Sequence, residues 1–229
     1  MVYNRMAVKF NVALKGASIM KLKATQKVKH EQNVQRGKRA KRKGGNYERV
    51  IANKFGERYG VELKRTPQSG GFAKKSEKAD DYRGDITIVD TKQMLLLHIE
   101  CKDHKTISLK KWIKQSEEDC PEGRIPVVIF HRFGTSKNYV ALKSDTRNSL
   151  CDEFFNFKFG FKVYDKTGCK QWKLLDWLDE AERDSHTRVI RKFPSLLIDY
   201  EGVNYEVVLL DDFLRAVPKD RVVGKRVFN

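Results

Sequence analysis

The stretch LLLHIECKD, residues 95–103, begins as a buried strand and ends in charged side chains. Its three leucines are typical of a strand that other elements cover. Glu100 and Lys102 follow, and side chains two positions apart on a strand point to the same face. The strand therefore ends by directing a carboxylate and an amine at one place.

A hairpin would bring a second acid to that place. Residues 85–90, DITIVD, and residues 94–102 predict two strands joined by a short turn. With a symmetric turn, Asp85 lies opposite His98, and Glu100 is the next residue on that face. A turn shifted by half a residue would move Asp85 to the other face. In the symmetric register, the acids at 85 and 100 and the lysine at 102 project into one site.

A helix over residues 46–60 supplies a further carboxylate. Asn46 is the expected N-cap and Gly60 the expected end of this helix. Glu48 shares a face with the apolar positions, which are Ile51, Ala52, Phe55 and Tyr59. Glu48 therefore either faces the sheet at the edge of the apolar stripe or is a first-turn acid that the helix dipole stabilises.

The order of the remaining elements predicts the fold class. Strands are expected over residues 61–67, 125–133 and 139–143, and a helix with Ser108 as its N-cap over 108–120. Together with the hairpin, this order predicts an α/β fold with a mixed central β-sheet flanked by helices.

The last third of the chain has a weaker pattern. A strand is expected within residues 154–165 and a helix within 170–184. Residues 125–142 and 194–210 share an order of proline, apolar strand, glycine turn, Asn-Tyr and apolar strand, which predicts two similar hairpins. We divide the chain into a mostly flexible basic arm (1–44), a core (45–144) and a C-terminal α+β extension (145–229) that packs on or extends the core.

The positive charge is concentrated at the start of the chain. The 229 residues carry a net charge of +17. Residues 1–45 hold 13 Lys or Arg against one acid, Glu31, and the rest is nearly balanced. This layout favours a nucleic-acid partner over an anionic membrane surface, because the basic stretch is polar all round. The residues expected to bind phosphates are Lys38, Arg39, Lys41, Arg42 and Lys43.

Cysteines and apolar runs exclude several classes. The four cysteines form no CxxC pair, so we expect no zinc site and free thiols in a reducing compartment. No apolar run approaches the roughly 20 residues of a membrane helix, and the start lacks a secretory signal. The expected location is the cytoplasm of a bacterial, archaeal or phage-infected cell, with an organelle as the alternative because the start is poor in acids.

Acids that converge on one place predict a metal. Carboxylates close together repel, and Mg²⁺ resolves this because it prefers oxygen ligands and keeps several waters. A bound metal lowers the pKa of such a water and stabilises charge on a phosphoryl oxygen. Lys102 would orient the water or neutralise the phosphate. A set of acids, a lysine and a basic surface is what a phosphodiester-cleaving site needs.

The pattern of Gly84-Asp85 with Glu100-Cys101-Lys102, and Glu48 on a preceding helix, resembles the PD-(D/E)xK nucleases. Gly84 stands where the name-giving proline would be. Residues 43–71 more narrowly resemble the opening of archaeal-type Holliday junction resolvases. The matching residues are Tyr47-Glu48-Arg49, Arg65 and Ser69-Gly70-Gly71. The resemblance covers about residues 43–142 and implies a restriction-endonuclease-like core.

The resemblance implies roles for the site residues. Asp85, Glu100 and the Cys101 carbonyl would be ligands of Mg²⁺, for which Mn²⁺ substitutes, and Glu48 would hold the metal or its water. Lys102 would position the nucleophile. Ser69 and Arg65 would approach the scissile strand, and Gln115 matches a glutamine of some nuclease families. Arg49 and Arg65 are candidate DNA contacts; Lys74 and Lys75, which flank the Ser-Gly loop, are either DNA contacts or solubility charges.

Three functions follow from the resemblance. The first is a homodimeric Holliday junction resolvase that cuts four-way junctions by paired nicks, leaving 5′-phosphate and 3′-hydroxyl ends. The second is another nuclease of this fold, in repair, replication or phage DNA processing. The third is a DNA-binding protein without catalysis, which an intact set of acids and lysine disfavours.

Overall fold

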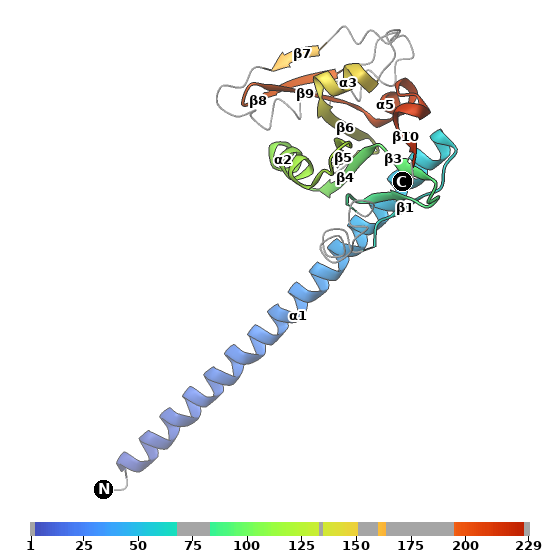
Figure 1. Cartoon of the computed structure of the whole chain (residues 1–229). Helices are drawn as coiled ribbons and strands as arrows, with labels where there is room; N and C mark the ends of the chain where they lie inside the picture. Colours follow the sequence, from blue (N-terminus) through green and yellow to red (C-terminus); the bar gives the residue numbers. More distant parts are fainter. Residues whose placement is uncertain (1–2, 68–82, 133–134, 151–159, 164–194, 227–229) are drawn as a thin grey trace. The chain divides into compact units, whose positions relative to one another are not determined.

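The computed structural model describes residues 3–67, 83–132, 135–150, 160–163 and 195–226 (Figure 1). It divides into two compact units, Met1–Lys43 and Gly44–Asn229. The second unit contains a mixed β-sheet with helices on both faces, as expected for the α/β class. In the described part of the chain, no helix has the length and apolar character needed to cross a membrane.

The basic arm is helical. The first helix, α1, runs from Tyr3 to Tyr59 and so includes the arm that was expected to be mostly flexible. The cause is composition, because this stretch has no proline and is rich in Ala, Lys, Arg, Gln and Met, which are good helix formers. Asn46 is therefore not an N-cap. Its side-chain oxygen accepts a hydrogen bond from Arg49 at 2.9 Å.

The end of α1 follows the sequence pattern. The predicted apolar face is buried, with Ile51 and Phe55 fully covered. Gly60 has a φ of +62°, and its N–H donates to the Gly56 carbonyl at 2.9 Å. This left-handed residue ends the helix where the glycine predicted it.

Six strands form the central sheet. In spatial order they are β4 (Leu97–His104), β5 (Ile125–Arg132), β6 (Asn138–Lys143), β9 (Val203–Leu209), β8 (Ser195–Tyr200) and β7 (Gly160–Val163). The β4/β5 and β7/β8 pairs are parallel, and the others are antiparallel. The two predicted hairpins are confirmed as β5/β6 and β8/β9, and β6 pairs with β9, so they lie side by side (Figure 1).

Two small antiparallel pairs flank this sheet. The strand β1 (Leu63–Arg65) pairs with β2 (Ile86–Ile88), and β3 (Gln93–Leu95) pairs with β10 (Val223–Lys225). The predicted pairing of residues 85–90 with 94–102 is therefore wrong. The run 94–102 breaks at Leu96, whose N–H bonds the Val222 carbonyl and whose carbonyl accepts from Ile125. The strands before and after this residue consequently take different partners.

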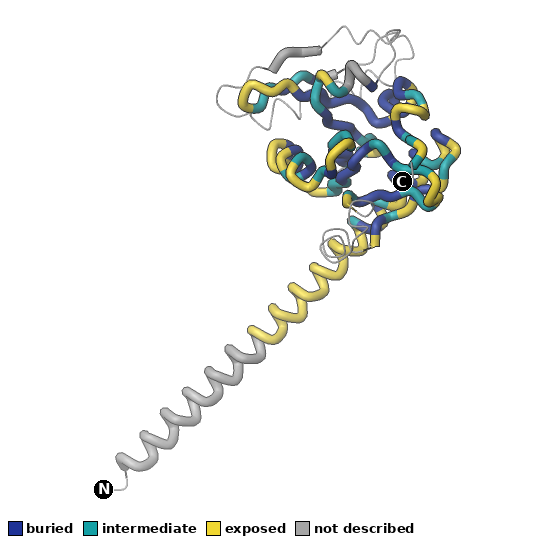
Figure 2. The backbone as a smooth tube through the Cα atoms, in the orientation of Figure 1, coloured by how far each residue is buried: buried dark blue, intermediate teal, exposed yellow. Residues whose placement is uncertain are grey.

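Helices cover both faces of the sheet. On one face, Phe55 of α1 and Phe213 of α5 (Leu210–Ala216) share a core with strand residues such as Ile129. On the other, Trp112 of α2 (Leu109–Asp119) packs on Phe130. The burial colours follow these two cores (Figure 2).

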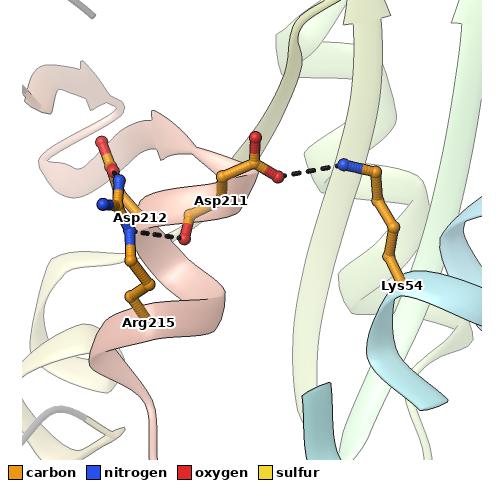
Figure 3. Close-up of polar contacts among 4 residues, drawn as sticks. All are labelled: Lys54, Asp211, Asp212 and Arg215. Carbon is orange, nitrogen blue, oxygen red and sulfur yellow. Dashed lines mark hydrogen bonds and ion pairs between the residues drawn. The ribbon is translucent and has the colours of Figure 1, made fainter. Parts of the chain in front are cut away.

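A few further contacts and elements complete the described fold. An ion pair of 3.0 Å joins Lys54 of α1 to Asp211 of α5 (Figure 3). Ser108 occupies the N-cap position of α2 as predicted, without a side-chain capping bond. The remaining described elements are α3 (Ser144–Leu150) and a short 3₁₀ helix (Lys219–Arg221). The helix expected within 170–184, and most of the strand expected within 154–165, lie outside the described residues.

Candidate active site

The acid and the lysine that end β4 meet a glutamine of α2. The Lys102 Nζ donates to Glu100 Oε1 at 2.5 Å, and both side chains are almost buried, at 12% and 11% exposure. Gln115 Oε1 accepts from the same Nζ at 3.0 Å, and Gln115 Nε2 donates to Glu100 Oε1 at 3.3 Å. These three predicted site residues therefore form one closed polar network.

Hydrogen bonds of both its backbone and its side chain join Asp85 to β4. Its N–H donates to the Ile99 carbonyl at 2.8 Å, and its carbonyl accepts from Thr66 of the segment that follows β1 at 2.9 Å. Asp85 Oδ2 accepts the backbone N–H of Cys101 at 2.8 Å. The expected register is wrong by one residue, because Asp85 is bonded to Ile99 and does not lie in a ladder opposite His98. The buried carboxylate nevertheless lies beside the acid at position 100.

The backbone conformation of Gly84 explains why this position does not hold the proline of the PD-(D/E)xK motif. It has a φ of +86°, a conformation that the proline ring forbids. A Cβ at this position would lie 3.1 Å from His98 Nδ1 and 3.1 Å from the Ile99 carbonyl oxygen. The close approach to β4 therefore demands a glycine, and it is this approach that brings Asp85 to the site.

Burial and mutual repulsion govern the charges of the acids. Burial first, and then the neighbouring Asp85, raise the pKa of Glu100 to about 7, although Lys102 opposes the shift. Burial also raises the pKa of Glu48, against the effect of Arg65, and Asp85 again adds to the rise. Asp85 acts on both glutamates, so the three acids share one electrostatic environment.

Glu48 comes to this environment from α1. Its carboxylate forms an ion pair with Arg65 at the end of β1, and the Arg65 guanidinium packs over Gly45. The two residues that flank Glu48 in the predicted motif have different environments. Tyr47 is buried against His131, whereas Arg49 is exposed. Arg65 was expected to contact DNA; in the structure its side chain is engaged by Glu48.

The donor set fits a hard cation. In the part of the chain that the structure describes, no three His, Cys, Asp or Glu side chains converge closely enough to hold a metal ion as they stand. Glu100 is turned to Lys102 and Glu48 to Arg65. Asp85 raises the pKa of both glutamates, and a nearby cation would stabilise the charged form of these carboxylates. The Cys101 thiol does not fit, because burial raises its pKa well above the usual value, which leaves its backbone carbonyl as a donor.

Two groups of predicted residues belong to other parts of the chain. Ser69, Lys74 and Lys75 lie outside the described residues. The arm residues from Lys38 to Lys43 belong to the first unit and are exposed.

Sequence reasoning missed a pair at the ends of β4 and β5. His131 Nδ1 lies 3.2 Å from Asp103 Oδ1, and His131 Nε2 lies 2.7 Å from the Thr135 carbonyl oxygen. In the sequence, an acid and a histidine stand at the ends of two consecutive predicted strands. Their contact could have been predicted only if the parallel pairing of these strands had been known.

The spacing of Asp85, Glu100 and Lys102 can be compared with known families. The profile of the family described as "Phage putative PDDEXK endonuclease" matches residues 39–201. Searches of curated proteins and of solved structures gave no significant match. The match contains the acid, acid and lysine that meet in the buried network, and it extends beyond them into β8. The chain belongs to this PD-(D/E)xK endonuclease family.

Proposed function

We propose that the protein is a divalent-metal-dependent endonuclease that hydrolyses phosphodiester bonds of DNA to 5′-phosphate and 3′-hydroxyl ends. The observation that carries the proposal is the convergence of Asp85, Glu100 and Lys102 in one almost buried network. A solvent-exposed ion pair at a strand end would not need this burial or the neighbouring acid.

The chemistry of each site residue indicates its role in the proposed reaction. Asp85, Glu100 and the Cys101 carbonyl would hold Mg²⁺ or Mn²⁺, with Glu48 next to them. When bound, the metal supplies an acidified water and stabilises charge on the phosphate. Lys102 Nζ is a donor beside the ligand oxygens and orients the attacking water. Gln115 positions that amine by accepting its second hydrogen bond.

The arm supports DNA as the substrate. Residues 26–43 are helical and exposed, and they carry eight Lys or Arg against one acid. A helix that is basic on all sides binds phosphates without regard to sequence, and its affinity falls steeply with salt. We assign this segment to DNA binding.

A Holliday junction resolvase is a second candidate. The observation in its favour is the opening Tyr47-Glu48 with Arg65, because Glu48 and Arg65 are paired beside Asp85. The family match names a phage endonuclease and gives no support for junctions, so the broader activity is the first proposal. A homodimer, which would place two sites on opposed strands, belongs to the junction hypothesis alone.

The test is cleavage of end-labelled linear duplex, single strand and four-way junction, with Mg²⁺ and with chelator. Metal-dependent cutting that is lost in Glu100→Gln supports the endonuclease. Paired symmetric nicks in the junction alone would establish the resolvase. Binding without cleavage by any divalent metal would refute both and leave a DNA-binding protein.

A further inference from the structure

A cavity of about 480 Å³ opens directly beside the proposed catalytic network. It lies between the end of β4 and the start of α2, and it shares Lys102 and Gln115 with the network. The other lining residues that matter here are His104, Lys105, Lys111 and Trp112. Its volume falls in the range of about 300 to 1,000 Å³ that is usual for bound small molecules.

The lining selects an anion. Three lysines reach the cavity, and none of its described lining residues is acidic. Lys105 and Lys111 are exposed, from the loop before α2 and from the first turn of that helix. Both side chains therefore reach the solvent side of the cavity, where a phosphate that follows the scissile one along a strand would pass.

One wall of the cavity is aromatic. The His104 ring lies 5.7 Å from the Trp112 ring, and Trp112 is fixed from behind by Phe130 at 6.0 Å. Trp112 is 6% exposed, whereas His104 is exposed. A ring supported in this way presents one face to a base, and sites for single strands combine such rings with a basic groove.

We propose that this cavity binds one unpaired nucleotide of the cleaved strand, next to the scissile phosphate. Lys105 and Lys111 hold its phosphate and His104 stacks on its base. A paired base must first be unpaired and unstacked to enter a pocket, so the preferred substrate has a single-stranded segment, a flap or a branch at the cut. This inference rests on the proposed nuclease function, because that function places the strand at Lys102.

Binding is measured in chelator, where no strand is cut. A labelled single-stranded oligonucleotide is titrated by fluorescence anisotropy into the full chain at several salt concentrations. We expect Lys105→Ala with Lys111→Ala to flatten the slope of log affinity against log salt by about 0.7, the value for one phosphate contact of a single strand. The matched control is Lys110→Ala with Lys114→Ala, which removes the same charge from α2 outside the cavity. Equal slopes for the two double variants would overturn the proposal.

The base contact has its own test. His104→Ala is expected to weaken binding of the oligonucleotide about fivefold or more, and to leave a strand that is abasic at the bound position unaffected. An equal loss with both strands would refute the stacking role. A free deoxynucleoside monophosphate is the competitor, and if it binds as tightly as the oligonucleotide, the cavity serves free nucleotides and the proposal is wrong.

Failure of this inference differs from failure of the proposed function. If the wild type cuts DNA and both double variants bind and cut equally, only the cavity assignment fails. If the wild type cuts nothing but the cavity variant alone loses single-strand affinity, the nuclease proposal fails and the nucleotide site stands.

Discussion

Replacing Glu100 by glutamine should stabilise the metal-free protein while it removes a proposed metal ligand. The ionised Glu100 is penalised by burial and by Asp85, and Lys102 does not offset the penalty. Glutamine has nearly the same shape and resembles the protonated acid. The variant therefore lacks the charged form that the fold disfavours.

The magnitude and its pH dependence follow from the pKa. The pKa of Glu100 rises from 4.5 in the unfolded chain to about 7 in the folded one. At about 1.4 kcal/mol per pKa unit, ionisation costs the fold about 3 kcal/mol. The cost is complete above the folded pKa, shrinks as the pH falls from about 7 to about 4.5, and vanishes below that. The advantage of Glu100→Gln should therefore grow by about 3 kcal/mol from about pH 4 to about pH 9.

The assay is urea unfolding in chelator across this pH range. Glu118→Gln is the matched control, since Glu118 is a largely exposed acid of α2, and its variant should follow the wild type. A parallel urea series with Mg²⁺ in place of chelator should raise the free energy of unfolding of the wild type and leave that of Glu100→Gln unchanged. A pH-independent difference between Glu100→Gln and the wild type would refute the electrostatic reasoning, and equal Mg²⁺ effects would refute the ligand assignment.

Three further substitutions test the fold and the arm. Gly84→Ala should cost more stability than Gly123→Ala in urea unfolding, by about 1 kcal/mol or more, because both have positive φ but only Gly84 meets backbone and side-chain atoms. Phe55→Ala should lower the free energy of unfolding by about 3 to 5 kcal/mol, and the exposed Val50→Ala by less than about 0.5. Replacing the five basic residues of 38–43 by glutamine should weaken duplex binding and reduce its salt slope by up to about 4; an unchanged slope would remove the arm from DNA binding.

Local sequence patterns were sufficient to predict those elements whose structure depends on residues close together in the sequence. The apolar face from Ile51 to Tyr59, the end of α1 at Gly60 and the α2 helix depend on side chains three or four positions apart. The two hairpins at 125–142 and 194–210 also followed, because each pairs residues that are neighbours along the chain.

Predictions failed where a distant partner or a balance of propensities decides. β3 pairs with β10, which lies far along the chain, and no local pattern in MLLLHIECK marks the break at Leu96. A helix was expected to begin at Asn46, but the absence of proline and the abundance of helix formers allow α1 to begin at Tyr3. The cavity beside Lys102 was also missed, since it forms where the end of β4 packs against α2, and only this packing brings Lys102 and Gln115 together.

Asp85, Glu100 and Lys102 lie close together although the predicted strand register is wrong, and the reason is physical. The convergence of Glu100 and Lys102 depends only on the alternation of side chains along β4, which any pairing preserves. Asp85 needs one close approach to that strand, and the absence of a side chain at Gly84 permits it. Two hydrogen bonds then fix the acid beside Glu100 without a hairpin ladder: the Asp85 N–H donates to the Ile99 carbonyl, and the Cys101 N–H donates to the Asp85 carboxylate. Glycine in place of the proline of the PD-(D/E)xK motif therefore still leaves Asp85 beside Glu100, because position 84 contributes backbone geometry and no side chain.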